Sequence, residues 1–139
     1  EQVARYQARI SGPLLDRIDI QVQVPTQPAE TLLERNPARE TSSEEIRRSV
    51  ELARQRQLGR QGRPNAQLVN SELELHCKMD GAGRELLLRA MNSLGLSARA
   101  YHRILRVART IADLEGREHI ELPHLTEAIG YRRMSMATH

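Results

Sequence analysis

The 139-residue chain has 21 Lys and Arg against 18 Asp and Glu, a net charge of +3, one cysteine and no Trp or Phe. This length fits one domain, or a small domain with part of another, and the modest charge does not by itself indicate a nucleic-acid-binding protein. The single Cys77 excludes an internal disulfide framework and favours a reducing compartment, so we expect a cytoplasmic protein. No apolar run approaches the ~18 residues of a membrane span.

Residues 1–25 differ in pattern from the rest of the chain. The alternation IDIQVQVP is typical of a β-strand over residues 18–24 that ends at Pro25. A lone strand cannot satisfy its own backbone hydrogen bonds. We therefore expect its sheet to lie outside this chain, which fits a first residue Glu1 rather than Met, and we expect residues 1–25 to be poorly ordered.

Arg17 lies just before this predicted strand, in the segment ISGPLLDRIDI, with Asp16 and Asp19 on either side. A guanidinium is costly to bury unless an acid or a ligand neutralises it. We interpret the two acids as the groups that hold its charge. Arg17 is expected either at an edge of the structure or at a site for an anion.

The remaining chain is predicted to be all-α. Residues 26–41 contain two prolines and are interpreted as a linker, residues 42–133 as a bundle of four to five helices, and residues 134–139 as a tail. Capping signals predict helix starts at Ser42 with Glu45, Ser71 with Glu74, Asp80 and Ser97. Helix ends are predicted at Gly59, Gly95 and Gly116, and a last helix over residues 122–131 has Leu122, Leu125 and Ile129 on one face.

The helix predicted after Ser97 has an apolar side for the core and an opposite basic side that consists of Arg99, His102, Arg103 and Arg106. Arg99 lies in the first turn, where the helix dipole disfavours a cation by a few tenths of a kcal/mol. A bound anion would make the electrostatic interaction at this helix end favourable. First-turn N–H groups with a guanidinium make a good phosphate site. The alternative is a solvated arginine on an exposed face.

Other kinds of site find little support. The phosphate loop G-x-x-x-x-G-K-[ST] is absent, so this chain alone is not expected to hydrolyse a nucleotide. The histidines lack the i, i+4 spacing of a helical zinc site, and no metal site is expected. Cys77 stands beside apolar residues and is interpreted as a small buried hydrophobe rather than a nucleophile.

Three segments together resemble a known family: YQARISGPLLDRIDIQVQVP, LSARAYHRILRVARTIADLEG and IELPHLTEAIGYR. They are similar to the C-terminal portion of the magnesium-chelatase-like AAA+ ATPases, in the ComM/YifB-like competence branch, over about residues 6–132. The resemblance implies that residues 42–133 are the helical AAA+ lid and residues 1–25 the end of the α/β core. It implies ATP and Mg as cofactors of the full-length protein, none bound by this fragment alone, and partners that are the AAA+ core, the neighbouring subunits of a ring that is commonly hexameric, and DNA; no membrane is implied.

The resemblance also implies roles for the arginines. Arg17 matches the arginine finger, which reaches into the ATP site of the neighbouring subunit and can contribute ~10³ to 10⁵ in rate. Arg99 matches the second-sensor arginine, which contacts the γ-phosphate bound by its own subunit, and Arg103 is a further candidate for that site. Two alternatives stay open: a stand-alone helical nucleic-acid-binding module that uses Arg99, Arg103 and Arg106 on phosphates, and the ATPase subunit of a metal-chelatase machine.

Overall fold

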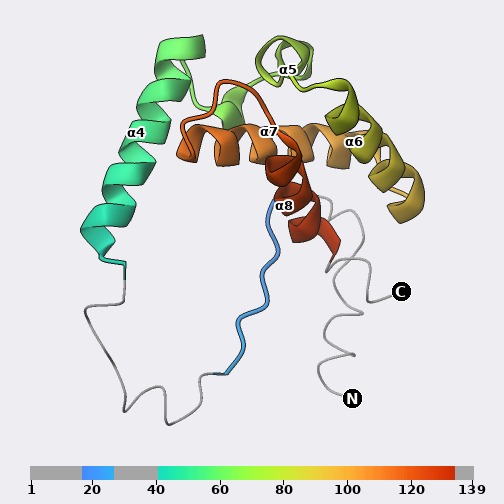
Figure 1. Ribbon diagram of the computed structural model, residues 1–139, viewed down its shortest axis with the longest axis horizontal. Helices are drawn as coiled ribbons and strands as arrows, with labels where there is room; N and C mark the ends of the chain where they lie inside the picture. The colour runs from blue at the N-terminus through green and yellow to red at the C-terminus, as the bar shows by residue number, and fades with distance from the viewer. Residues whose placement is uncertain (1–16, 27–40, 134–139) are drawn as a thin grey trace.

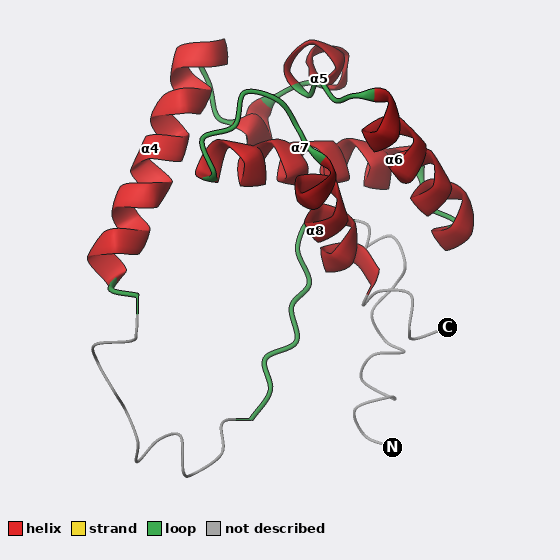
Figure 2. Ribbon diagram, in the orientation of Figure 1, coloured by secondary structure: helices red, strands yellow, loops and turns green. Residues whose placement is uncertain are grey.

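The computed structural model describes residues 17–26 and 41–133. In these residues the regular structure is helical, which confirms the predicted all-α class (Figures 1 and 2). The elements are α4 (Ser43–Gln61), the short 3-10 helix η2 (Asn65–Gln67), α5 (Asn70–His76), α6 (Gly81–Leu94), α7 (Ala98–Leu114) and α8 (Leu122–Arg133). No helix of the described part is long and apolar enough to cross a membrane.

No strand forms over residues 18–24 in the described chain, and because its sheet is expected outside this chain, the strand stays a prediction. Segment 17–26 runs as a loop from the side of α8 (Figure 2). Its backbone is bonded to α8 through the Gln21 N–H, which donates to the Tyr131 carbonyl at 3.2 Å. A strand requires a neighbouring strand to complete its ladder, and the described residues supply none. Residues 1–16, 27–40 and 134–139, which include most of the predicted linker and the tail, lie outside the described residues.

Three of the four predicted helix caps are confirmed. Ser42 and Glu45 form the full capping box, with the Ser42 N–H donating to the Glu45 carboxylate at 2.8 Å and the Glu45 N–H to the Ser42 hydroxyl at 3.2 Å. Asp80 caps α6 and Ser97 caps α7. The prediction at Ser71 is wrong, because α5 begins one residue earlier, at Asn70, and the carboxylate of Glu72 accepts from the N–H that precedes the helix.

The helix ends were predicted less accurately at α4 than elsewhere. Gly95 ends α6 as predicted, in the left-handed conformation with φ 57°. Helix α4, however, continues through Gly59 and ends at Gln61, where Gly62 adopts φ 72°. Glycine weakens a helix interior but does not break it, so the first glycine need not be the last residue.

Helix α7 lies at the centre of the bundle. It packs against α4, α5, α8 and η2, and α6 packs against α8 (Figure 1). The shared core is aliphatic, with the buried side chains Leu68, Leu73, Cys77, Leu87, Ala90, Ile104, Leu105, Ala108, Ile111, Ile120, Leu125, Ala128 and Ile129. Of the predicted face of α8, Leu125 and Ile129 are buried as expected, whereas Leu122 is 42% exposed because it is the first residue of the helix.

A polar network, which we call the Asp113 network, fixes α4 and η2 to the end of α7. Asp113 is 1% exposed and pairs with Arg60 at 2.6 Å and with the equally buried Arg109 at 3.1 Å. The amide of Asn65 donates to its second carboxylate oxygen at 2.8 Å. Arg56 donates to the Asp113 backbone carbonyl at 2.7 Å. A buried charge is tolerated only when it is paired and hydrogen-bonded in this way.

The carboxyl group of Asp113 remains ionised in this setting. Its burial acts to raise the pKa, but the hydrogen bonds from Arg60 and Asn65 and the charges of Arg109 and Arg60 outweigh that effect and hold the pKa below the ordinary value. An acid whose pKa is lowered by folding stabilises the fold above its unfolded pKa, here about 4. That contribution is lost as the pH falls through the folded-state pKa.

We predict that Asp113→Ala costs about 3–5 kcal/mol in the free energy of unfolding, because it leaves Arg109 buried beside an empty site. The measurement is urea denaturation at pH 7. Asp113→Asn cannot titrate, so its free energy of unfolding should fall less below pH 4 than that of the wild type. Glu85→Ala is the control, since the pair of Glu85 with Arg89 is exposed and 3.6 Å long, and it should change stability little. Equal small effects from Asp113→Ala and Glu85→Ala would contradict the role of the network.

Candidate functional site

The candidate site begins at the first turn of α7. Ser97 precedes the helix and its hydroxyl accepts from the Ala100 N–H at 3.2 Å. Arg99 follows as the second residue of α7 and is exposed. Its guanidinium makes no hydrogen bond or ion pair with the residues that the structure describes. A cation thus stands beside the positive end of a capped helix, an arrangement that favours an anionic ligand.

The other members of the predicted basic side of α7 are engaged in contacts within the chain. Arg103 forms an ion pair with Asp19. Arg106 donates to the Leu68 carbonyl at 2.9 and 3.1 Å and to the Asn70 side chain at 2.9 Å. His102 is partly buried. The predicted basic side is therefore not uniformly open to a ligand, and Arg99 is its exposed member.

Arg17 is exposed at the start of segment 17–26. The interpretation that Asp19 holds its charge is wrong, because Asp19 pairs with Arg103 instead. Asp16, the other predicted partner, lies outside the described residues. Exposure leaves Arg17 able to reach a group outside this chain.

The structure does not join Arg17 to Arg99, but it links the two regions in which they lie. Asp19 is two residues after Arg17, and Arg103 is one helical turn after Arg99 on the same helix. The sequence reasoning did not anticipate this link, and it also missed the Asp113 network. A signal for the network was present: Arg109 and Asp113 are an i, i+4 pair of opposite charges on a helix rich in core residues.

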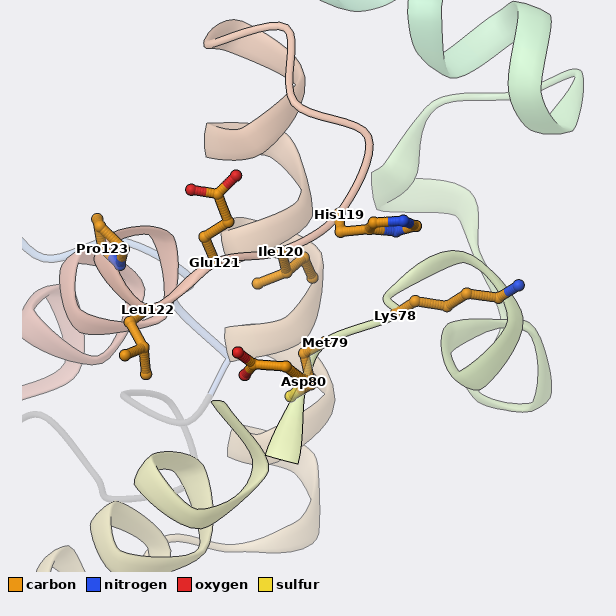
Figure 3. Close-up of a pocket in the computed structure, with 8 residues that line it drawn as sticks. All are labelled: Lys78, Met79, Asp80, His119, Ile120, Glu121, Leu122 and Pro123. Carbon is orange, nitrogen blue, oxygen red and sulfur yellow. The ribbon is translucent and has the colours of Figure 1, made fainter. Parts of the chain in front are cut away.

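A hollow of about 650 Å³ lies where the loop before α8 meets the start of α6 (Figure 3). It is lined by Lys78, Met79, Asp80, His119, Ile120, Glu121, Leu122 and Pro123. Two of these lining residues, Met79 and Ile120, are joined by a parallel β-bridge. Asp80 already caps α6 through the Gly83 N–H at 2.7 Å. Within the described residues no three His, Cys, Asp or Glu side chains gather as a metal site would require.

Comparison with known proteins identifies relatives of the whole chain. The family model described as magnesium chelatase, subunit ChlI C-terminal, matches residues 40–132, and the model for magnesium chelatase, subunit ChlI, matches residues 1–32. The boundary between the two models falls within the predicted linker, residues 26–41.

The chain is 47% identical over 134 residues to the competence protein ComM of Haemophilus influenzae, with 96% of this chain and 26% of that protein covered. It is 40% identical over 132 residues to the uncharacterized protein YifB of Escherichia coli, with 95% and 26% covered. An uncharacterized protein of Mycobacterium tuberculosis H37Rv is 33% identical over 133 residues, with 93% and 26% covered. The chain thus spans about a quarter of the length of these relatives.

Cys77 is a structural residue rather than a nucleophile, as the sequence indicates. The side chain is 4% exposed, and its Sγ lies 3.7 Å from the Leu105 carbonyl oxygen. Burial raises the pKa of the thiol to about 11, although nearby arginines act in the opposite direction. A thiol of this kind is almost entirely protonated near neutral pH.

We predict that the Cys77 thiol of the folded chain reacts slowly with a disulfide reagent such as Ellman's reagent at pH 8. A pKa of about 11 leaves about one thiol in a thousand ionised at that pH, and burial blocks access. Reaction should become fast in urea, where the thiol is exposed. The same fast rate with and without urea would contradict the burial of Cys77.

Proposed function

Because the chain belongs to the family of magnesium chelatase subunit ChlI, we propose that residues 42–133 form the lid of an AAA+ ATPase that couples ATP binding and hydrolysis in a ring to DNA processing. Residues 1–25 would be the end of its α/β core, and residues 26–41 the linker. The similarity to a competence protein favours a role in natural competence. The proposed working site is in the cytoplasm.

The observation that carries this proposal is the position of Arg99. It is exposed, has no recorded partner in the described part of the chain, and projects from the first turn of a helix capped by Ser97. The helix dipole and the guanidinium both favour a negative charge at this point. A phosphate oxygen of a nucleotide satisfies both, which is the role proposed for a second-sensor arginine.

The residues present fit ATP better than they fit its metal ion. ATP would supply the γ-phosphoryl group whose transfer to water drives the ring. Arg99 would hold this group from its own subunit and neutralise part of its charge. The described residues offer no cluster of acids for Mg²⁺, so we assign the metal and the phosphate loop to the core.

Arg17 is proposed as the arginine finger that completes the site of the neighbouring subunit. Its exposure and its lack of a recorded partner among the described residues suit a guanidinium that acts outside its own chain. A finger acting in this way requires a heterologous interface that closes into a ring, and we propose a homo-oligomer, most simply a hexamer.

Two competing functions receive less support. A stand-alone nucleic-acid-binding module would use Arg99, Arg103 and Arg106 together, yet Arg103 is paired with Asp19 and Arg106 is bound to the chain at Leu68 and Asn70. The subunit of a metal chelatase is consistent with the family description, but the most similar of the relatives named above is a competence protein. We therefore favour DNA as the substrate of the ring.

We predict different defects for the two arginines in ATP turnover by the full-length protein. Arg17→Ala should lower kcat by ~10³-fold or more, and activity should return when it is mixed with a subunit that cannot bind ATP but keeps Arg17. Arg99→Ala should weaken ATP binding and hydrolysis at its own site, so the same mixture should not restore it.

The matched control is Arg89→Ala, which removes an exposed arginine of α6 that pairs only with Glu85 among the described residues. It should leave ATP turnover and ATP affinity unchanged. Full activity in both Arg17→Ala and Arg99→Ala would refute the proposed function. Salt-sensitive DNA binding that is lost in Arg99→Ala and indifferent to nucleotide would favour the nucleic-acid-binding module instead.

A further inference from the structure

Segment 17–26 contacts both α7 and α8, through two different kinds of interaction. The carboxylate of Asp19 pairs with Arg103 of α7. Two residues later, the Gln21 N–H donates to the carbonyl of Tyr131 in α8 at 3.2 Å. The first contact is between side chains and the second between backbones, so the segment is held at one point on each helix.

A hollow of about 350 Å³ lies at this junction, lined by Asp19 and Ile20 of the segment and by side chains of α7 and α8 that include Arg103, Val107 and Tyr131. Ile20 is still half exposed, so the segment rests on the surface and is not part of the core. A segment held in this way depends on its polar contacts more than on buried apolar area. The ion pair of Asp19 with Arg103 is therefore its specific attachment to α7.

Arg103 lies on the helix that carries Arg99 and contacts the segment that carries Arg17. On α7 it follows Arg99 by four residues, one turn of the helix. Through Asp19 it holds a backbone that carries Arg17 two residues earlier. A helix is stiff over one turn, so the positions of Arg99 and of segment 17–26 are set by the same rigid element.

We propose that Arg103 is a positioning residue, and that its ion pair with Asp19 ties the arginine-finger segment of a subunit to the helix that carries its ATP-contacting arginine. This inference rests on the proposed function. It replaces the role in ATP binding that the sequence resemblance suggested for Arg103, because the guanidinium is already paired. Its consequence is that the ATP site of one subunit and the finger presented to the next are mechanically connected.

The physical link is tested first, by amide hydrogen exchange in the full-length protein without nucleotide. In the wild type the Gln21 amide, which is bonded to Tyr131, should exchange slowly. Arg103→Ala should speed its exchange several-fold, and Arg103→Lys should retain most of the protection. Pairing Asp19→Arg with Arg103→Asp should restore it, while each of these two changes alone should not. Unchanged exchange at Gln21 in Arg103→Ala would overturn the link.

The functional consequence is tested in mixed rings. Donor subunits that cannot bind ATP supply Arg17 to acceptor subunits that carry Arg17→Ala. Adding Arg103→Ala to the donor should reduce the restored ATP turnover about fivefold or more, whereas adding it to the acceptor should leave turnover and ATP affinity unchanged. Thermal denaturation of each donor verifies that it is folded, and Arg89→Ala in the donor is the matched control.

The outcomes separate the two proposals. If donors with intact Arg103 restore no activity, the finger assignment and the proposed function fail, while the exchange result still decides the link. If they restore activity and Arg103→Ala in the donor has no effect, the positioning role fails and the proposed function stands. An equal loss of ATP turnover from Arg103→Ala in donor and in acceptor would also overturn the positioning role, because it would indicate a general structural role for Arg103.

Discussion

The arrangement of the bundle depends on one buried carboxylate, that of Asp113. Helix α4 contributes only Ala53 and Gln57 as buried residues, so apolar packing alone holds it weakly to the bundle. Arg60 and Arg56 of α4, with Asn65 of η2, converge instead on Asp113 at the end of α7. Since partners of a buried charge must meet strict geometry, this single acid specifies the angle and register of α4 more sharply than its few apolar contacts could.

The arginines of α7 occupy a series of different environments along one helix. Arg109 is buried and paired with Asp113, Arg106 is bound to the chain near α5, and Arg103 is paired with segment 17–26. Arg99 alone of these four is exposed without a recorded partner among the described residues. Four arginines of one helix are thus buried in the core, bonded to a neighbouring loop, paired with segment 17–26, and exposed, respectively. The helix can offer one guanidinium to a ligand because the others are already neutralised by internal partners.

The sequence predicted what is decided locally and missed what is decided by distant contacts. The caps at Ser42, Asp80 and Ser97 involve residues three apart, and their pattern is legible in any window of the chain. The pairs of Asp113 with Arg60 and of Asp19 with Arg103 join residues far apart in sequence, and no local pattern predicts either of these two pairings. No strand forms over residues 18–24 for a related reason, because a strand needs a partner strand and the described residues supply none. For the candidate site, the exposure of Arg99 was predictable from helical periodicity, whereas the occupied state of Arg103 and Arg106 was not.

Because α7 is a long, stiff helix anchored at Asp113, a small tilt at that end would move its other end farther. Arg99 and Asp113 are fourteen residues apart, so about 21 Å of helix separates the exposed guanidinium from the anchored carboxylate. A tilt of about 5° around the anchored end would displace the other end by about 2 Å, with each residue keeping its helical hydrogen bonds. Because Arg103 lies near that moving end, the segment bound to it would travel with it. A small change of hydrogen-bond length at the Asp113 end of α7 would therefore produce a larger displacement at the Arg99 end, without unfolding of the bundle.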